Sequence, residues 1–506
     1  MPERPHRLRI QTELGHMQSL SSGTATVLKM PGPGDVLLLG LGPTPASLTD
    51  FFPAGRAVYV IEAPEFKSQM PDSWLEEIPE HWKFVSADDL SDAQIRAAHI
   101  IIYRPALRFF PSFWGKILGR SRWLKCQTSG HIEPRRYAIL PGSESDLLVH
   151  EISDALDRLS FRVRRVLPSQ CPAILPRLLQ SEQPELFLSV NFRGLDKYGE
   201  LFHLLQAAGI KVAVWCVDNP FHQICGLRSP FWKELTIFVT DETFVPLLRL
   251  HGAQNVHHLP LGAWPEHCIP QAESSTDYAL ENRLVFVGRS EFPHKKEFFA
   301  GCSMSSELHQ EGLAKLEQGE RPDFEWSAAR CQAWPMWPGP EVRRAGYVAE
   351  MLNMDYRIAC LQCNAHNRLT VFGNPEWTDL VPDLSDLRKP VDYYSALPGI
   401  YKQAGWCLNM TSLLLPRGLT QRHFDVWISG GFLITDSTPG LHIFPEALTQ
   451  DIRFSSPSDI PAIMKRFPPE STARDDLRLE WVNLLLTEHT YVHRVGEIMN
   501  VMGVCL

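Results

Sequence analysis

The chain has no long run of apolar residues. A membrane-spanning helix needs about 18 consecutive apolar residues, and no stretch approaches that length. The longest candidate, from Val36 to Leu41, has the length of a buried strand. The segment from Met1 to Ile10 has basic residues but no apolar core behind them, unlike a secretory signal. We therefore expect neither a membrane span nor export.

An excess of positive charge is also absent. Lys and Arg number 49 against 58 Asp and Glu, which gives a net charge of −9 at pH 7. This balance argues against a nucleic-acid partner, because non-specific binding to nucleic acid draws on a basic surface. A local basic pocket for a phosphate is compatible with this negative net charge. The length of 506 residues predicts about three domains.

The cysteines do not form a disulfide framework or a full zinc motif. The 11 cysteines are an odd number scattered along the chain, which fits reduced thiols and predicts a cytoplasmic location. Cys360 and Cys363 form a CxxC with His366 nearby, but no second pair accompanies them. We interpret them as ordinary, partly buried thiols.

What the sequence does contain is an alternation of short apolar runs and helical periods, which predicts parallel α/β sheets. The first runs are 35–41, 57–61 and 99–103, preceded by a strand-poor leader over residues 1–30. A turn from Gly40 to Thr44, with Glu62 twenty residues after Gly42, matches part of a dinucleotide-binding pattern. Two interpretations stay open: a nucleoside-like ligand bound in a methyltransferase-like or docking domain, or a small α/β domain whose turn merely needs glycine.

The same alternation divides the chain. We predict a small Rossmann-like α/β domain of unknown role over 1–134, a second α/β domain over 135–270 and a third over 271–474. Residues 475–506 form a closing helix that crosses back to the second domain, with His489 and His493 on one face. Residues 264–281 are polar and form the best linker candidate.

Polar residues follow the predicted strands of the second and third domains. Because open parallel sheets bind ligands beyond the carboxyl ends of their strands, these residues are candidates for a site. The alternative is that strand ends are loops, which are polar in any case. The residues are Asn191, Asp218, Asn219, Asp241, Gly288, Arg289, Gly373, Asn409, Thr411 and Asp436.

The segment from Asn409 to Gly431 is the most specific of these. Arg417 and Gly418 precede a predicted helix for which Thr420 is a candidate N-cap, and Arg422 follows in the first turn. A helix N-terminus and two arginines suit a diphosphate. The alternative is a capped core helix with solvated arginines.

Several motifs resemble group 1 glycosyltransferases, in the form of the CgeB (spore maturation) family. The resemblance covers about residues 180–500. It rests on Arg422 with the following HFDVWISGGFLITD, Gly440–Leu441, 371–373 with Trp377, 391–394, 488–495, 215–220 and 259–262. Related proteins occur in flagellin glycosylation loci.

The resemblance implies a GT-B architecture, in which two doubly wound domains face a cleft, preceded here by an extra α/β domain. It also implies a metal-independent enzyme without a cofactor and a nucleotide-sugar donor, UDP- or dTDP-linked, on the third domain. The carried-over donor residues are Gly288, Arg289, Phe372, Gly373, Trp377, Asn409, Thr411, Arg417, Gly418, Thr420, Arg422 and Asp425. The family's glutamate pair spaced by seven is not matched, because only Asp425 stands at an acidic position, so the stereochemical outcome stays open.

A transfer reaction also needs a general base. Asp218, His222 and Asp241 are the candidates, since they lie at or after strand ends of the second domain, and Asp218 is favoured; the alternative for Asp218 is an ordinary turn before Pro220. We expect a hexosyl- or deoxyhexosyltransferase acting on a protein acceptor, with flagellin Ser/Thr among the candidates, or on a glycan. The rival hypothesis is a non-catalytic binding or assembly protein on a degenerate GT-B scaffold.

Overall fold

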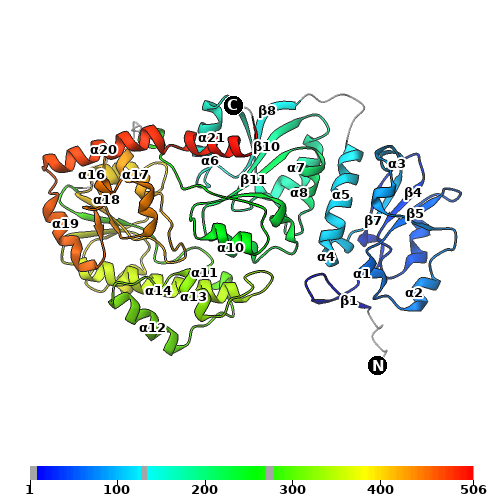
Figure 1. The fold of residues 1–506 in the computed structure, drawn as a ribbon, viewed down its shortest axis with the longest axis horizontal. Coiled ribbons are helices and arrows are strands. Elements are labelled where there is room, and N and C mark those ends of the chain that lie inside the picture. Colours follow the sequence, from blue (N-terminus) through cyan, green and yellow to red (C-terminus); the bar gives the residue numbers. More distant parts are fainter. Residues whose placement is uncertain (1–7, 127–133, 269–278, 505–506) are drawn as a thin grey trace. The chain divides into compact units, whose positions relative to one another are not determined.

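The computed structural model describes residues 8–126, 134–268 and 279–504. Its strands form a β1–β2 hairpin and three larger α/β sheets (Figure 1), which confirms the predicted class of two Rossmann-like sheets with an additional N-terminal α/β domain. The described residues fall into two compact units. The first comprises the chain up to Asp146 with Phe161–Val214 and Gly226–Leu235, and the second comprises Leu147–Ser160, Trp215–Cys225 and the chain from Thr236 onward.

The N-terminal sheet has the strand order β3-β7-β4-β5-β6, with β3 antiparallel to β7 and the other neighbours parallel. The predicted strand-poor leader is wrong, because residues 9–30 supply β1, β2 and β3. Their short, mostly exposed strands lack the apolar run that reveals a buried strand. The strands are β1 (Arg9–Gln11), β2 (Met17–Ser19), β3 (Val27–Met30), β4 (Val36–Leu39), β5 (Val58–Ile61), β6 (Lys83–Phe84) and β7 (His99–Tyr103).

Short helices accompany this sheet and a longer one, α5, follows it. Gly115 and Gly119 of α5 lie against His203 of α8, so closely that an added Cβ would come within 2.3 Å and 2.6 Å of its atoms. The helices are α1 (Pro64–Lys67), α2 (Asp72–Glu76), α3 (Asp92–Ala97), α4 (Ala106–Phe109) and α5 (Pro111–Cys126).

The second sheet has the order β13-β12-β11-β10-β8-β9. Its strands are β8 (Pro134–Pro141), β9 (Arg162–Val166), β10 (Gln183–Val190), β11 (Lys211–Cys216), β12 (Thr236–Val239) and β13 (Asn255–His258). Its helices are α6 (Val149–Arg158), α7 (Cys171–Leu178), α8 (Glu200–Ala207), α9 (Pro220–Ile224) and α10 (Phe244–Leu250).

The third sheet is wholly parallel, with the order β16-β15-β14-β17-β18-β19. Its strands are β14 (Leu284–Val287), β15 (Leu369–Phe372), β16 (Leu387–Arg388), β17 (Trp406–Asn409), β18 (Leu433–Asp436) and β19 (Arg453–Phe454). Its helices are α11 (Lys295–Phe298), α12 (Ser306–Glu317), α13 (Phe324–Arg330), α14 (Glu341–Asn364), α15 (Trp377–Leu380), α16 (Leu397–Gln403), α17 (Arg422–Ile428), α18 (Glu446–Thr449) and α19 (Ile460–Arg466).

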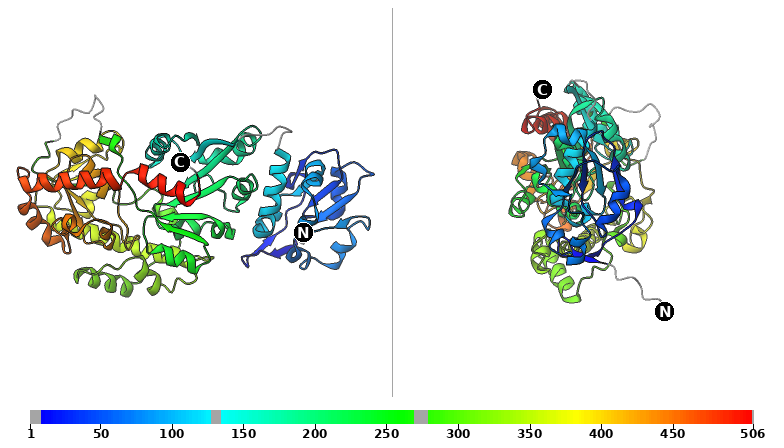
Figure 2. Two further views of the ribbon diagram at one scale, coloured as in Figure 1. Left: turned by 45° about the horizontal axis from the view of Figure 1, so that its top comes forward. Right: turned by 90° about the vertical axis from the view of Figure 1, so that its right-hand side faces the viewer.

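The chain ends in two helices rather than the single predicted one: α20 (Thr472–Glu488) and α21 (Tyr491–Val501), drawn in red in Figure 2. The break follows from Thr490, whose hydroxyl caps α21 by accepting from the backbone N–H of His493. Thr490 also forms a bridge with Ala263, and α21 packs on α6. No helix among the described residues is long and apolar enough to cross a membrane.

Candidate functional site

The third sheet has a topological switch point between β14 and β17, where the strand order reverses direction. In open α/β sheets, ligands bind beyond the carboxyl ends of the strands at such a point. Gly288 follows β14 there, and Asn409 is the last residue of β17. This edge of the sheet is therefore the candidate site.

Arg422 connects the two strands at the switch point. Its Nη2 donates to the carbonyl oxygen of Val287, and its Nη1 donates to Asn409 Oδ1 at 3.3 Å. The predicted N-cap role of Thr420 is wrong: α17 starts at Arg422, has no side-chain cap, and the Thr420 hydroxyl donates to Asn409 Oδ1 at 3.0 Å. Because α17 has only seven residues, the positive charge at this edge comes from arginine side chains rather than from the helix end.

A second arginine, Arg357 of α14, lies beside the first. Both guanidinium groups lie over the ring of Phe286, at 5.4 Å for Arg357 and 5.7 Å for Arg422. Arg357 also donates to the carbonyl oxygen of Arg289. Burial lowers the pKa of the Arg357 guanidinium to about 10, and the charge of Arg422 adds to this effect. Sequence reasoning missed Arg357 because it lies inside a long helix, far along the chain from β14.

The positive charge of this pair is not neutralised by the protein. In the described part of the chain, neither guanidinium forms a salt bridge. Their hydrogen bonds go to uncharged oxygens, which are carbonyl and amide oxygens and, for Arg422, the hydroxyl of Tyr401. Of the nearby acids, Glu350 pairs with Lys295 at 3.3 Å, and Asp425 has a pKa of about 8 because it is buried. At neutral pH the switch point thus carries two cations, which suits a dianionic ligand such as a diphosphate.

The backbone approaches closely at the ends of β14 and β15. An added Cβ on Gly373 would lie 2.6 Å from the carbonyl oxygen of Gly288, and one on Gly288 would lie 2.8 Å from the ring of Phe286. Trp377 donates its indole N–H to the Gly288 carbonyl at 2.9 Å. Trp377 and Phe372 are 0% and 3% exposed, so they form the packed floor of this edge rather than a surface on which a base could stack. The side chain of Arg289 is exposed.

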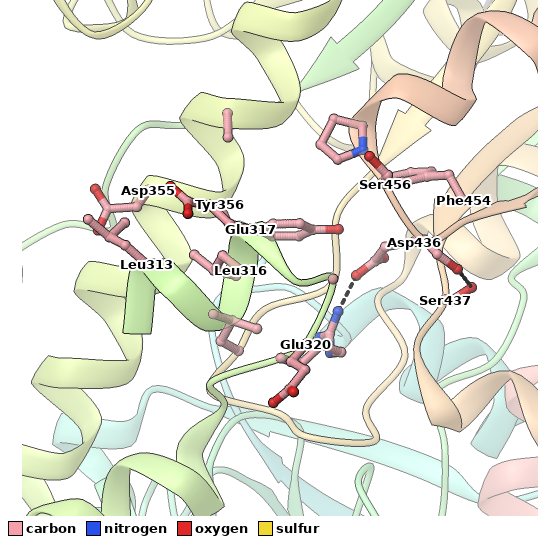
Figure 3. A pocket seen from close by; sticks show the side chains of 16 residues that line it. Leu313, Leu316, Glu317, Glu320, Asp355, Tyr356, Asp436, Ser437, Phe454 and Ser456 are labelled. Carbon is pink, nitrogen blue, oxygen red and sulfur yellow. Dashed lines mark hydrogen bonds and ion pairs between the residues drawn. The ribbon is translucent and has the colours of Figure 1, made fainter. Parts of the chain in front are cut away.

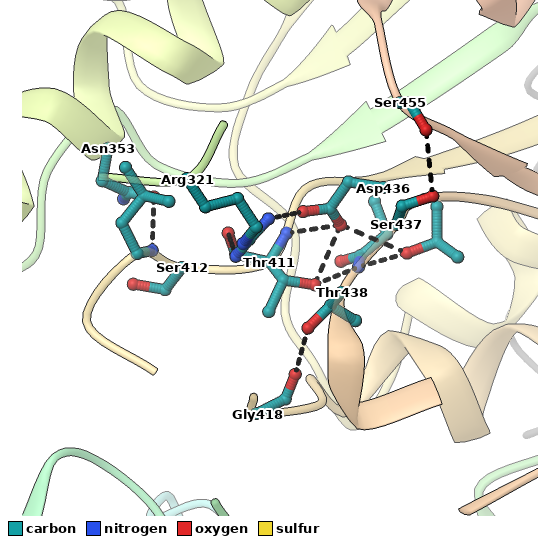
Figure 4. A network of polar contacts seen from close by, with 12 residues as sticks. Arg321, Asn353, Thr411, Ser412, Gly418, Asp436, Ser437, Thr438 and Ser455 are labelled. Atoms are coloured by element: carbon teal, nitrogen blue, oxygen red, sulfur yellow. Dashed lines mark hydrogen bonds and ion pairs between the residues drawn. The ribbon is translucent and has the colours of Figure 1, made fainter. Parts of the chain in front are cut away.

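A buried polar network supports the end of β17 (Figure 4). Thr411 donates from its backbone N–H and its hydroxyl to Asp436 Oδ1, both at 2.9 Å. Arg321 pairs with the other oxygen of Asp436. Thr438 donates to the carbonyl oxygen of Gly418 at 3.2 Å. These contacts tie the loop between β17 and α17 to the end of β18 and the residues that follow it.

The two predicted diphosphate arginines do not meet at one site. The backbone N–H of Arg417 donates to Asp241 Oδ2 at 2.9 Å, and its guanidinium donates to Glu242 at 3.1 Å. Arg422 instead contacts Val287 and Asn409. The expected convergence of Arg417 and Arg422 is therefore replaced by the pair of Arg357 and Arg422.

The three candidate bases have different surroundings. Asp218 is exposed at the end of β11. Asp241 is fully buried and accepts backbone hydrogen bonds from Arg417 and Thr243, and burial raises the pKa of its carboxyl. The ring of His222 packs against Phe298, Phe299 and Phe324. Burial lowers the pKa of His222 to about 4, so it is uncharged at neutral pH.

Asp425 belongs to a buried cluster of acids and tyrosines. Tyr393 donates to Asp425 Oδ2 at 2.7 Å, and Tyr394 donates to Glu151 Oε2 at 3.0 Å. The two tyrosine rings pack edge to face, 4.8 Å between centroids. Burial raises the pKa of Glu151 to about 7 and that of Asp425 to about 8, and the proximity of Glu151 contributes to the shift at Asp425.

The Gly40–Gly42 turn and Glu62, which were candidates for a nucleoside site, form hydrogen bonds within the protein. At the Gly40–Gly42 turn, Glu62 accepts from the backbone N–H of Leu41 at 2.7 Å, and Trp74 donates to the carbonyl oxygen of Gly42 at 2.7 Å. An added Cβ on Gly42 would lie 3.0 Å from the ring of Tyr103. The turn is thus contacted by the protein's own side chains from Glu62, Trp74 and Tyr103.

The histidines at the end of the chain do not share a helix face, contrary to the prediction. His489 follows α20 and contacts Arg494, whereas His493 lies in α21 and contacts Thr490. Cys360 is buried and Cys363 is exposed on α14. In the described ranges, no group of three or more His, Cys, Asp or Glu side chains is placed to hold a metal ion.

Residues 357–500 match a family model described as "Glycosyl transferase-like". This C-terminal segment is similar in sequence to glycosyltransferases. It begins at Arg357 and contains Asn409, Arg422 and Asp425. No curated protein is significantly similar to the chain in sequence.

Solved structures give weak likenesses. HepE from Anabaena, in complex with UDP and glucose, is 9% identical over 74% of this chain and 100% of that chain, with a TM-score of 0.40. A UDP-forming α,α-trehalose-phosphate synthase from Burkholderia vietnamiensis is 9% identical over 93% and 99%, with a TM-score of 0.37. These TM-scores carry no conclusion about this chain, so its fold class rests on its own sheet topology.

Proposed function

We propose that the chain is a glycosyltransferase that binds a nucleotide-diphosphate sugar at the switch point between β14 and β17. The observation that carries the proposal is the unneutralised pair of Arg357 and Arg422, which lies within the segment that matches the glycosyltransferase-like family model. Two guanidinium groups at the carboxyl edge of a parallel sheet match the charge of a diphosphate.

In the proposed reaction, an acceptor hydroxyl oxygen forms a bond to the anomeric carbon of the sugar. The bond from that carbon to the diphosphate oxygen breaks, and its electron pair leaves with the nucleoside diphosphate. Arg357 and Arg422 stabilise the negative charge that develops on this oxygen, the role that a metal ion fills in other enzymes. The acceptor proton passes to a general base.

We assign the base to Asp218, since its side chain is exposed at a strand end. Asp241 is engaged by two backbone N–H groups, and His222 is packed among phenylalanine rings. The donor we propose is a UDP- or dTDP-linked hexose or deoxyhexose, and the acceptor a protein hydroxyl, as on flagellin, or a glycan. The proposed location is the cytoplasm.

The test is a thermal-shift screen of the full chain against UDP, GDP, dTDP and CMP. A ligand at about 100 times its Kd adds about 2.7 kcal/mol to the stability of the state that binds it, which a melting curve detects. We expect one nucleoside diphosphate to raise the melting temperature of the wild type, and Arg357→Ala and Arg422→Ala to abolish that rise. Arg466→Ala is the matched control, because Arg466 is an exposed arginine paired with Asp451.

The nucleotide found in this way is then supplied as its sugar conjugate, and release of the nucleoside diphosphate is measured with the wild type and with Asp218→Asn. Absence of a shift with every nucleotide would contradict the proposal and favour the non-catalytic scaffold. Binding without release in the presence of protein and glycan acceptors would favour a nucleotide-sugar-binding protein.

A further inference from the structure

A cavity of about 370 Å³ in the third sheet is not used by the proposed function. It lies at the carboxyl ends of β18 and β19 and is walled by α12 and α14 (Figure 3). The proposed donor residues follow β14, β15 and β17, so the cavity occupies the other half of the sheet edge. Its volume lies within the range of small-molecule sites in proteins.

The walls of the cavity combine apolar and aromatic surface with hydroxyl groups. Leu313 and Leu316 of α12, Tyr356 of α14, and Phe454 of β19 supply the apolar part. Three serines after β18 and β19 also line it: Ser437, Ser455 and Ser456. An aromatic ring packs well against the C–H face of a sugar ring, and a hydroxyl can both donate and accept a hydrogen bond.

The charged groups of the cavity are mostly acidic. Glu317, Glu320, Asp355 and Asp436 line it, against the single guanidinium of Arg321. Arg321 is already paired with Asp436. Glu320 also pairs with Lys315, and Asp355 contacts His309 at 2.7 Å. The carboxylate of Glu317 opposes the binding of phosphates and carboxylic acids, because like charges repel in a partly desolvated site.

The unmet hydrogen-bonding capacity of the walls defines the complementary ligand. Carboxylates only accept hydrogen bonds, so a ligand brings a donor to Glu317, whereas Glu320 already accepts from Lys315. Arg321 offers the opposite group, because its Nε–H is buried without a hydrogen-bond partner among the described residues. A buried donor left without a partner costs free energy and is satisfied by an acceptor on a ligand or by water. A molecule with several hydroxyl groups supplies donors and acceptors together.

We propose that this cavity is a binding site for an uncharged sugar ring, separate from the proposed donor site. The ring's apolar face packs on Tyr356 and on the two leucines of α12, and its hydroxyls bond to Glu317, the serines and Arg321. Binding here is communicated to the donor side through Asp436, which accepts from Arg321 on the cavity side and from Thr411 in the loop after β17. A sugar in the cavity therefore steadies the loop that contains the proposed diphosphate contacts.

The test is saturation-transfer NMR of the full chain with glucose, galactose, N-acetylglucosamine and rhamnose. Glucose 6-phosphate and putrescine serve as an anionic and a cationic probe. The blocking variant is Ala359→Trp, because Ala359 is an exposed helix residue that lines the cavity. The matched control is Cys363→Trp, which places the same side chain at an exposed position one turn further along α14.

We expect at least one neutral sugar to give a signal that falls more than fivefold in Ala359→Trp and is unchanged in Cys363→Trp. Melting curves of both variants must match the wild type. The proposal is overturned if no neutral sugar binds, if the signal persists in Ala359→Trp, or if only glucose 6-phosphate or putrescine binds. The nucleotide shift of Ala359→Trp is measured in parallel, so loss of the sugar signal is separated from failure of the donor site.

Discussion

Replacement of Asp425 by asparagine tests the electrostatics of the switch point directly. Asp425 is 1% exposed, and the only hydrogen bond of its carboxyl group among the described residues is the one from Tyr393 at 2.7 Å. Asparagine retains the oxygen that accepts this bond but cannot ionise. The variant therefore isolates the free-energy cost of the charge on a buried carboxyl group.

The magnitude follows from the shift in pKa. Burial raises the pKa of Asp425 from 3.8 to about 8. Because this folded-state pKa lies above the unfolded one, the native state keeps a proton that the unfolded state loses, and stability falls as pH rises between about 4 and 8. The slope is about 1.4 kcal/mol per pH unit, so wild type loses roughly 2–3 kcal/mol relative to Asp425→Asn between pH 5 and pH 7.

The assay compares melting temperatures of wild type and Asp425→Asn at pH 5, 6 and 7. For a unit of this size we expect the variant to gain on the order of 5 °C relative to wild type across that range. Asp451→Asn, a change at an exposed aspartate paired with Arg466, should show no such trend. A difference between wild type and Asp425→Asn that stays constant from pH 5 to pH 7 would refute the reasoning, because it would mean that Asp425 is ionised throughout.

Three smaller changes test packing in the two units. Trp377→Phe keeps a ring in the floor of the site but removes the hydrogen bond to Gly288, which should lower stability by about 1 kcal/mol; an unchanged melting curve would show that this bond is not needed. Gly119→Ala forces a Cβ to within 2.6 Å of the His203 backbone and should cost roughly 1–3 kcal/mol in the first unit. Gly399→Ala in α16 meets open space and should stabilise by about 0.5–1 kcal/mol, so a loss comparable to that of Gly119→Ala would contradict the packing argument.

The buried central strands of all three sheets were accessible from the sequence because such strands are nearly continuous apolar runs. The short, partly buried or exposed strands β3, β6, β16 and β19 were not predicted. The run from His99 to Tyr103 matches β7 residue for residue. The hairpin of β1 and β2 was not accessible, since its exposed residues carry no such signal. Helix α5 was not predicted because it contains glycines, which have low helix propensity. The structure places these glycines where α5 packs closely against His203.

The candidate site was accessible only where its parts are near in sequence. Asn409, Thr420 and Arg422 lie within fourteen residues of one another, and the structure joins them by hydrogen bonds. Arg357 contributes through its position over Phe286, about seventy residues earlier in the chain. Such a contact arises from the packing of a helix on a sheet, and the spacing of residues along the sequence does not predict it.

The attachment of α21 determines how this chain can be divided for expression. Arg494 donates to the carbonyl oxygen of Leu261 at 3.1 Å, and the apolar residues Val495 and Ile498 are fully buried. A fragment that stops after β13 lacks α21, so the surface of α6 that α21 covers is exposed. A fragment that starts at β14 contains α21 but lacks α6, so the apolar residues of α21 are exposed. Each half produced alone should therefore be poorly soluble, whereas co-expression of the halves should yield a recoverable, reassociated pair.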